Sequence, residues 1–508
     1  MDEQKAKAPG WGAREKPCHV GVRWLFLRML AAAYLAAFGS LWTQIIGLLG
    51  KDGILPAARY LEQARRQLGG AGWLELPTLF WWNISDAALW GACALGTGLS
   101  LLAMAGVAQG LAFAALWMLW LSLFGIGQEF PSFQWDLLLL EAGFLAIFFA
   151  PWKLRPGLAR EDRPSRALLW LLRWLLFRLM FRSGVVKLAS GDPAWWGLTA
   201  LQVHYETQPL PTWIGWWAHQ LPAPFQRASC AAMFGIELAL PFLIVAPRKL
   251  RFVACGGFAT LMVLISLTGN YCYFNWLTLA LAVLLLDDRA VTRELPTKLL
   301  PSDVEENARA FEPGWKRAVN GAIAGLLVLI SLGQLHVLFP VRLPSAAALA
   351  ALERAVRPFC VFNHYGLFAV MTPERPEIQV EGSADGKTWL AYEFRYKAGD
   401  PMRAPGFVAP HQPRLDWQMW FAALGTYREN PWFMSFLERL LLGSREVRAL
   451  LEKDPFPDAP PRYVRATLLD YRFTRLAERR ATGAWWKRES KGLYCPAVSL
   501  GETTGGGL

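Results

Sequence analysis

The stretch QGLAFAALWMLWLSLFGIGQEFPSFQWDLLLLEAGFLAIFFA, residues 109–150, decides the class of fold. It contains two apolar runs, 109–127 and 134–150, separated by a short loop without Lys or Arg. A helix needs about 20 mostly apolar residues to cross the hydrocarbon core of a bilayer. Two such runs in succession therefore predict an antiparallel pair of membrane helices.

The composition of the whole chain agrees with a membrane protein. Of its 508 residues, 54% are hydrophobic and only 18% are charged, whereas soluble globular chains carry about 25% charged residues. Lys plus Arg (52) exceed Asp plus Glu (40), which gives a net charge of +12. Multispanning membrane proteins acquire such an excess by keeping Lys and Arg in cytoplasmic loops. Because the chain has neither a finger-type Cys/His spacing nor a basic and aromatic platform, we expect no nucleic-acid partner.

Further runs of similar length bring the prediction to about nine transmembrane helices. The predicted spans are 24–47, 86–106, 109–127, 134–150, 167–188, 228–246, 252–268, 271–286 and 318–339. The N-terminal segment and the loops after the fourth, sixth and eighth spans are rich in Lys and Arg. Under the positive-inside rule these segments are cytoplasmic. The N-terminus is then cytoplasmic, and the chain after about residue 340 lies on the other side of the membrane.

The tail after the last predicted span has the mixed, charged composition of a water-exposed domain. Alternating apolar and polar residues over 390–397 predict a strand, and Asp385-Gly386 before them predicts a hairpin turn. A second alternation over 463–473 predicts another strand, and the periodicity of 414–453 predicts helix. The tail is therefore expected to be a β-rich domain with a helical insertion.

The fold predicted from these patterns is a polytopic α-helical membrane protein with a C-terminal extracytoplasmic β-rich domain. The expected division is a cytoplasmic segment 1–23, a membrane domain 24–340, an α+β domain 341–500 and a disordered end 501–508. The seven cysteines form no CxxC pair and no metal-ligand spacing with the six histidines, so no metal site is expected. The sequence leaves open whether Cys360 and Cys495, both in the tail, pair in an oxidising compartment.

Ionisable side chains fall inside the predicted spans, where a charge is costly and faces the bundle interior or a wet cavity. This intramembrane cluster comprises Glu141, Arg173, Arg178, Arg182 and Glu237, with Lys187 at the end of the fifth span. Arg178 and Arg182 are four residues apart and share one face of that helix. Two interpretations remain open, namely structural ion pairs with Glu141 and Glu237 or a site for an anionic or protonatable group.

The segment after the fifth span, 191–222, is rich in Trp and Pro and fits an interfacial position on the outer face. It contains the consecutive polar residues His204, Tyr205, Glu206, Thr207 and Gln208. His204 and Glu206 have HxE spacing, which lacks the second His of a helical zinc motif. The cluster suggests either a hydrogen-bonded structural or recognition turn, or general acid–base chemistry.

Several stretches, taken in order, resemble the lipase maturation factor family of membrane proteins. They are IIGLLGKDGILPA (45–57), GQEFPSFQWDLLLLEAGFLAIFFAP (127–151), RLMFRSGVVKL (178–188), HYETQPLP (204–211), GNYCYFNWLT (269–278) and, in the tail, NHYGLFAVMT, YEFRYKAGDP, RLDWQMWFAAL and WWKR. The resemblance implies a protein that, in animals, resides in the ER membrane and helps secreted dimeric lipases reach an active fold. It also implies that the C-terminal region faces the lumen and engages the lipase, so we expect a folding factor without a cofactor.

On this resemblance, the tail segment RLDWQMWF is the best candidate for a recognition surface, and a buried aromatic helix is the competing interpretation. The candidate recognition residues are Arg414, Asp416, Trp417 and Trp420, together with Tyr205, Thr207 and Gln208. The expected partner is a secreted or periplasmic protein client, with a lipase as one candidate. Because the chain has no KDEL-like or dilysine retrieval signal, we favour a bacterial inner membrane over the ER membrane of the animal members.

A shorter resemblance supports one alternative. Gly184-Val185-Val186-Lys187-Leu188 is similar to a segment of the vitamin K-dependent carboxylase and related horizontally transferred transmembrane proteins. In those enzymes the Lys is implicated as a base in hydroquinone chemistry. This resemblance implies a membrane enzyme acting on a lipid or quinone, with Lys187 as base and His204 or Glu206 assisting.

Overall fold

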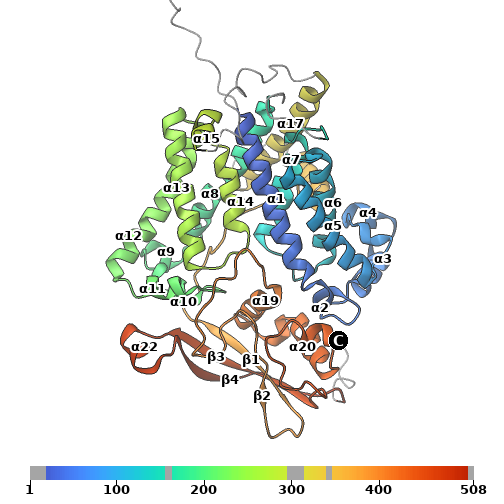
Figure 1. The fold of residues 1–508 in the computed structure, drawn as a ribbon, viewed down its shortest axis with the longest axis vertical. Coiled ribbons are helices and arrows are strands. Elements are labelled where there is room, and N and C mark those ends of the chain that lie inside the picture. The colour runs from blue at the N-terminus through green and yellow to red at the C-terminus, as the bar shows by residue number, and fades with distance from the viewer. Residues whose placement is uncertain (1–18, 155–162, 295–313, 339–345, 502–508) are drawn as a thin grey trace, which may run out of the picture.

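The computed structural model describes residues 19–154, 163–294, 314–338 and 346–501. Its helices form a bundle, and a small sheet with several helices packs against one end of that bundle (Figure 1). The first part of the bundle consists of α1 (Val20–Trp42), α2 (Ile45–Leu49), α3 (Ala57–Leu68), α4 (Gly72–Glu75), α5 (Asp86–Ala105), α6 (Gln109–Ile126) and α7 (Gln134–Phe149).

The second part of the bundle begins with the long helix α8 (Arg166–Ala189). It continues with α9 (Pro193–Trp196), α10 (Leu201–Thr207), α11 (Trp213–His219), α12 (Ala223–Phe234), α13 (Arg248–Thr268), α14 (Phe274–Val283), α15 (Asp288–Glu294), α17 (Gly314–Leu338) and α18 (Ala346–Val356). After α12 the chain makes a π-helical turn, Gly235–Ala239, and a 3-10 segment, Leu240–Val245. The π turn carries Glu237, which is buried.

Each of the nine predicted spans overlaps a helix or consecutive helices. Among the described residues, five helical segments are long and apolar enough to cross a membrane: Val20–Trp42, Asp86–Ala105, Gln109–Ile126, Ala223–Val245 and Arg248–Thr268. By comparison, α7 has 16 residues, α14 has 10 residues, and α8 is interrupted by cationic side chains. The protein is thus an α-helical membrane protein, while the number nine and the side on which the tail lies stay predictions.

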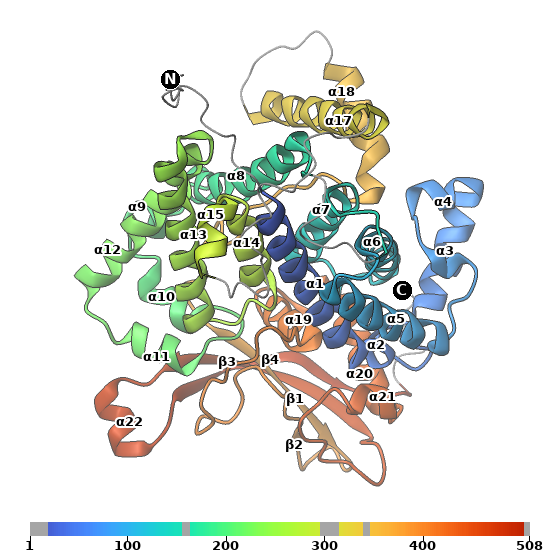
Figure 2. The ribbon, with the colours of Figure 1, turned by 45° about the horizontal axis from the view of Figure 1, so that its top comes forward.

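The tail contains one four-stranded antiparallel sheet in the order β2-β1-β3-β4. Its strands are β1 (Pro376–Ser383), β2 (Leu390–Ala391), β3 (Tyr463–Phe473) and β4 (Trp486–Val498), and its helices are α19 (Arg414–Ala423), α20 (Pro431–Leu441), α21 (Arg445–Arg448) and α22 (Leu476–Thr482). The sheet lies across the end of the bundle, with α22 beside α11 (Figure 2). The strand predicted over 463–473 and the helices predicted within 414–453 are confirmed.

The predicted hairpin turn is also confirmed, but the strand predicted over 390–397 is wrong beyond its first two residues. Glu381 pairs with Ala391 in β1 and β2, and Gly386 in the turn has a φ of +75°. After Tyr392, whose amide still donates to Val380 of β1, the chain leaves the sheet: Glu393 forms an isolated bridge with Lys453, and the amides of Tyr396 and Lys397 donate to the Asp416 carboxylate of α19.

One hydrophobic core continues from the bundle into the tail. Trp417 of α19 packs edge-on against Trp135 of α7, with ring centroids 4.8 Å apart, and Trp135 stacks on Phe133 at 4.7 Å. Phe26 of α1 and Phe433 of α20 are both fully buried in this same core. Because the tail shares its core with the membrane helices, its position relative to the bundle is determined by packing.

Candidate functional site

A buried ion pair joins the tail to the membrane domain. Arg414 begins α19 and is fully buried, and its guanidinium donates to both carboxylate oxygens of Asp136 in α7, at 3.0 and 3.2 Å. Arg414 also donates to the Phe130 carbonyl at 2.7 Å, and the Tyr273 hydroxyl donates to Asp136 at 2.6 Å. A two-pronged contact of this kind holds both partners in one geometry. It fixes the start of α19 against the bundle.

The other tail residues predicted for recognition lie at the same junction. The buried carboxylate of Asp416 accepts the amides of Tyr396 and Lys397 at 2.9 Å each, and burial raises the pKa of Asp416. The Trp420 indole donates to the Thr207 carbonyl at 2.9 Å. In α19 only Phe421 is a largely exposed large apolar side chain. The segment is therefore a buried aromatic helix in this structure, and a direct role in recognition stays a prediction.

The segment His204–Gln208 forms the membrane-domain side of the junction. The Glu206 carboxylate accepts the Phe473 amide of β3 at 2.9 Å and lies 3.7 Å from His219. The Gln208 amide donates to the carbonyls of Tyr205 and Thr268, at 3.1 and 2.9 Å. The predicted turn is therefore wrong in form: His204–Thr207 are the C-terminal end of α10, Gln208 is its C-cap, and these hydrogen bonds hold that helix end in place. Its roles in recognition or in acid–base chemistry stay predictions.

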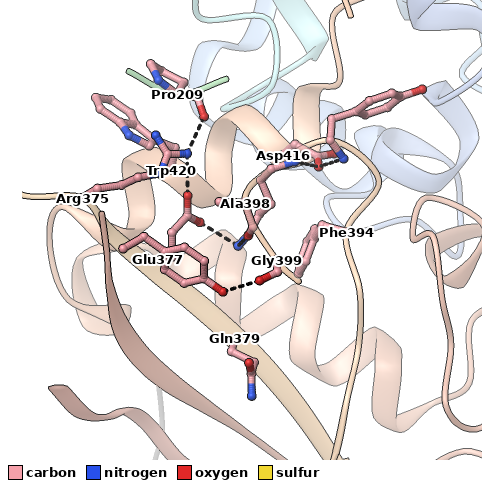
Figure 3. A network of polar contacts seen from close by, with 12 residues as sticks. Pro209, Arg375, Glu377, Gln379, Phe394, Ala398, Gly399, Asp416 and Trp420 are labelled. Atoms are coloured by element: carbon pink, nitrogen blue, oxygen red, sulfur yellow. Dashed lines mark hydrogen bonds and ion pairs between the residues drawn. The ribbon is translucent and has the colours of Figure 1, made fainter. Parts of the chain in front are cut away.

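A network around Glu377 completes the junction (Figure 3). Arg375 donates to the carbonyls of Glu206, Gln208 and Pro209 and to Glu377, the last at 2.7 Å. Lys397 donates to the second oxygen of Glu377, also at 2.7 Å. All three charged side chains are at most 4% exposed. The sequence held no signal for this network, because Arg375 and the carbonyls that it binds are more than 160 residues apart.

The charges inside the bundle also have partners. Arg178 pairs with Glu141, which accepts further hydrogen bonds from the Tyr365 hydroxyl at 2.6 Å and the Asn363 amide at 3.0 Å. Arg173 donates twice to the Leu284 carbonyl, at 2.8 and 2.9 Å. Hydrogen-bonded partners of this kind offset the cost of burying a charge, and both the structural and the functional interpretation of the cluster stay predictions.

Arg182 lies near the start of the tail. Burial and the positive charge of Arg182 lower the pKa of His364. His364 also lies 3.6 Å from the Glu353 carboxylate of α18. The positive charge of Arg182 therefore disfavours protonation of His364, which lies in the segment between α18 and the sheet.

Lys187 lies in an ion pair with Glu237 and also beside a cavity. Its ammonium donates to both carboxylate oxygens of Glu237, at 2.9 and 2.8 Å, and to the Ser183 carbonyl at 3.2 Å. The cavity has a volume of about 500 Å³, and His204 also lines it. The close approach of α8 to the π turn depends on Gly184, where a Cβ would lie 2.7 Å from Leu238.

Two family models match the chain and together cover most of it. The model described as the lipase maturation factor transmembrane domain matches residues 21–293. The model described as the lipase maturation factor C-terminal domain matches residues 361–496. The chain belongs to the lipase maturation factor family.

Similar proteins with this family name cover nearly the whole chain. Lipase maturation factor 2 of Gallus gallus is 41% identical over 96% of this chain and 82% of its own length. Lipase maturation factor 2 of Homo sapiens is 38% identical over 95% of this chain and 83% of its own. Lipase maturation factor 1 of Bos taurus is 34% identical over 99% of this chain and 95% of its own. No solved structure matches.

The cysteines of this lipase maturation factor family member do not pair in the part of the chain that the structure describes. Cys360 and Cys495 are both free and buried, and the Cys495 sulfur lies 3.9 Å from the Met434 sulfur. Burial raises the pKa of Cys495 to about 11, so its thiol is protonated at neutral pH. The described residues contain no group of three His, Cys, Asp or Glu that could hold a metal ion.

Proposed function

We propose that this protein assists the maturation of a secreted, lipase-type client, and that the client binds to an extracytoplasmic C-terminal domain. Family membership supports the first part, because the relatives that match both domains are named lipase maturation factors. The main supporting observation is that the tail packs against one end of the membrane bundle through buried charges. Arg414 pairs with Asp136 of the bundle, and Arg375, which also pairs with Glu377 of the tail, donates to carbonyls of the bundle.

The distribution of basic residues supports the proposed orientation. The basic residues Arg248, Lys249 and Arg251 lie at the start of α13, and the other end of that helix meets the tail, where Asn270 donates to Gly406 at 2.8 Å. A 21-residue helix is about 30 Å long. Cytoplasmic loops of membrane proteins are enriched in Lys and Arg, which favours the cytoplasmic side for the start of α13. The tail would then lie on the opposite, extracytoplasmic side.

The surface that we propose for the client is the edge of the sheet formed by β4. This 13-residue strand is the last in the sheet order, and its residues 487–493 are exposed. An edge strand presents unpaired backbone N–H and C=O groups to which an extended segment can add. The opposite edge, β2, has two residues and offers little length. An incompletely folded client exposes extended segments of this kind.

The test is site-specific photo-crosslinking in cells that co-express the full chain with a secreted lipase. A photo-reactive residue is placed at Ser490 or Leu493 of β4 and, as control, at Trp82, which is 74% exposed and precedes α5. We expect crosslinks to the newly made lipase from Ser490 and Leu493 and none from Trp82. Equal crosslinking at all three positions would contradict the β4 edge as the client surface.

A separate readout tests the function itself. Co-expression of the wild-type chain in cells without an endogenous lipase maturation factor is expected to raise the specific activity of the secreted lipase several-fold. The matched control is a secreted enzyme of another fold, whose specific activity is expected to stay unchanged. No gain in lipase activity would overturn the proposed function, whatever the crosslinking shows.

A further inference from the structure

The cavity beside Lys187 is a candidate binding site that the client-binding function does not use. It lies within the helical part of the molecule, between α8, α10 to α14 and the chain at Leu367 and Phe368. Apolar side chains form most of its wall, among them Met180, Met233, Leu261, Met262 and Phe274. A volume of about 500 Å³ is within the range of small-molecule sites.

The cavity also reaches the outer surface of the bundle. Phe225 of α12 and Leu264 of α13 line it and are 57% and 53% exposed. Both lie in segments that are candidate membrane spans. Exposed apolar side chains on such segments face hydrocarbon in a bilayer. A ligand that enters here comes from the lipid phase, so it is itself largely apolar.

The charged groups in the cavity wall are already paired. The three N–H donors of the Lys187 ammonium are matched by three acceptors, the two oxygens of Glu237 and the Ser183 carbonyl. Each carboxylate oxygen of Glu237 in turn accepts from Lys187. The pair is therefore neutral as a unit, and it offers a ligand neither a free cation nor a free anion.

His204 contributes a hydrogen-bond acceptor without a partner. The Gln208 amide donates to two backbone carbonyls, so its oxygen accepts the Tyr271 hydroxyl proton at 2.9 Å. The Tyr271 oxygen must then accept from His204 Nε2, which lies 3.2 Å away. That assigns the ring proton to Nε2 and leaves Nδ1 as an acceptor. His204 Nδ1 is buried and has no hydrogen-bond partner in the described part of the chain.

Asn275 contributes a second unpartnered acceptor. The Ser266 hydroxyl donates to the Met262 carbonyl at 2.8 Å, so Ser266 can only accept from Asn275, which it does at 3.0 Å. The amide nitrogen of Asn275 therefore faces Ser266, and the amide oxygen faces away from it. That oxygen has no partner among the described residues, and Asn275 is 2% exposed. Asn275 lines the cavity, and a buried acceptor left unpaired costs free energy, which a ligand donor that reaches it would recover.

We propose that the cavity binds an uncharged lipid whose single hydrocarbon chain fills the apolar part and whose hydroxyl head donates to His204 and Asn275. The apolar wall matches the chain, and the two acceptors match hydroxyl donors. The pairing of Lys187 with Glu237 disfavours a fatty-acid anion, because Lys187 has no N–H left to donate to its carboxylate, which would also lie close to Glu237. The monoacylglycerol class combines these properties.

The first test compares three lipids with the same hydrocarbon chain on the purified full-length protein in detergent. The probes are 1-monooleoylglycerol, methyl oleate, which lacks a hydroxyl, and oleate, which is charged. Binding is measured by competition against labelled 1-monooleoylglycerol. We expect 1-monooleoylglycerol to compete at least tenfold better than either of the others. Equal competition by methyl oleate, preference for oleate, or no binding at all overturns the proposal.

Variants then locate the site. Met233→Trp fills the cavity without removing a polar group, and its matched control is Met118→Trp at an exposed position of α6. Binding of 1-monooleoylglycerol is expected to fall at least tenfold in Met233→Trp and in Asn275→Leu and to stay unchanged in Met118→Trp. Each variant is first checked for an unchanged elution profile and melting temperature. A well-folded Met233→Trp protein with full binding would place the lipid elsewhere and overturn the proposal.

Discussion

At the scale of single residues, the buried charges of this protein mainly hold structural elements together. Arg414, Glu377 and Glu141 each accept or donate several hydrogen bonds in places from which water is excluded. A buried charge that has lost its partner is strongly destabilising, whereas a complete pair is tolerated. These residues therefore hold elements in one arrangement, and each can be tested by removing one side of its pair.

The pair of Asp136 and Arg414 gives the clearest residue-scale prediction. Asp136→Asn leaves the buried Arg414 cation without a counter-charge, so we expect a loss of stability of about 3–5 kcal/mol. The double variant Asp136→Leu with Arg414→Met is expected to recover part of that loss, because it removes both charges. The measurement is the melting temperature of each purified variant in detergent.

An exposed ion pair provides the matched control for that experiment. Arg66 and Glu62 pair on α3, with side chains 75% and 63% exposed. Glu62→Gln is expected to change stability by less than about 0.5 kcal/mol, because solvent screens an exposed pair. If Asp136→Asn and Glu62→Gln shift the melting temperature equally, the buried pair of Asp136 and Arg414 does not stabilise the contact of α19 with the bundle.

At the scale of elements, local patterns predicted helices and turns better than strands. Helices within 414–453 and the turn at Asp385-Gly386 follow from spacing and turn chemistry that neighbouring residues satisfy by themselves. The alternation over 390–397 did not give a full strand because its later residues pair with distant partners, Glu393 with Lys453 and the amides of Tyr396 and Lys397 with Asp416. The strand β4 was not predicted, because its residues 487–491 are all polar, four of them charged, and so do not alternate with apolar ones.

The hairpin between β1 and β2 supports an element-scale prediction. Gly386 has a φ of +75°, which an L side chain adopts only with strain, although a Cβ there would have space. Gly386→Ala is expected to lower stability by about 1 kcal/mol. Gly406→Ala is the control, since that glycine has neither a positive φ nor an atom within 4 Å of its added Cβ. Thermal unfolding compares the two, and equal stabilities would show that the turn tolerates a side chain.

At the scale of the whole molecule, the tail and the bundle form one packed unit. The composition of the tail suggested a separate water-exposed domain, but Arg375, Arg414 and Trp417 of the tail are buried against the bundle. Carbonyls of the segment 206–209 accept hydrogen bonds from Arg375 and Trp420. Removing the tail from the bundle would separate Arg414 from Asp136 and would expose the rings of Trp417 and Trp420.

That docking predicts how the two parts behave when they are separated. A fragment 346–508 produced alone is expected to aggregate, because the buried faces of α19 and Arg375 become exposed. The same fragment co-expressed with 1–338 is expected to co-purify with it in detergent, and Arg414→Met in the fragment is expected to reduce recovery. Size-exclusion chromatography measures both results. A fragment that is monomeric and folded by itself would show that the docking is not needed for its fold.

The sequence by itself determined that this is a helical membrane protein of the lipase maturation factor family. Apolar runs, loop charges and ordered motifs are properties of neighbouring residues, so they can be read along the chain. It also singled out the segments around His204 and Arg414, although not what they contact. Only the tertiary structure decided that these segments meet, that Arg375 binds the carbonyls of residues 206, 208 and 209 at the end of α10, and that Lys187 and Glu237 close one side of a cavity. The physical reason is that each of these contacts joins residues at least 50 positions apart, and their partners are selected by the packing of whole helices.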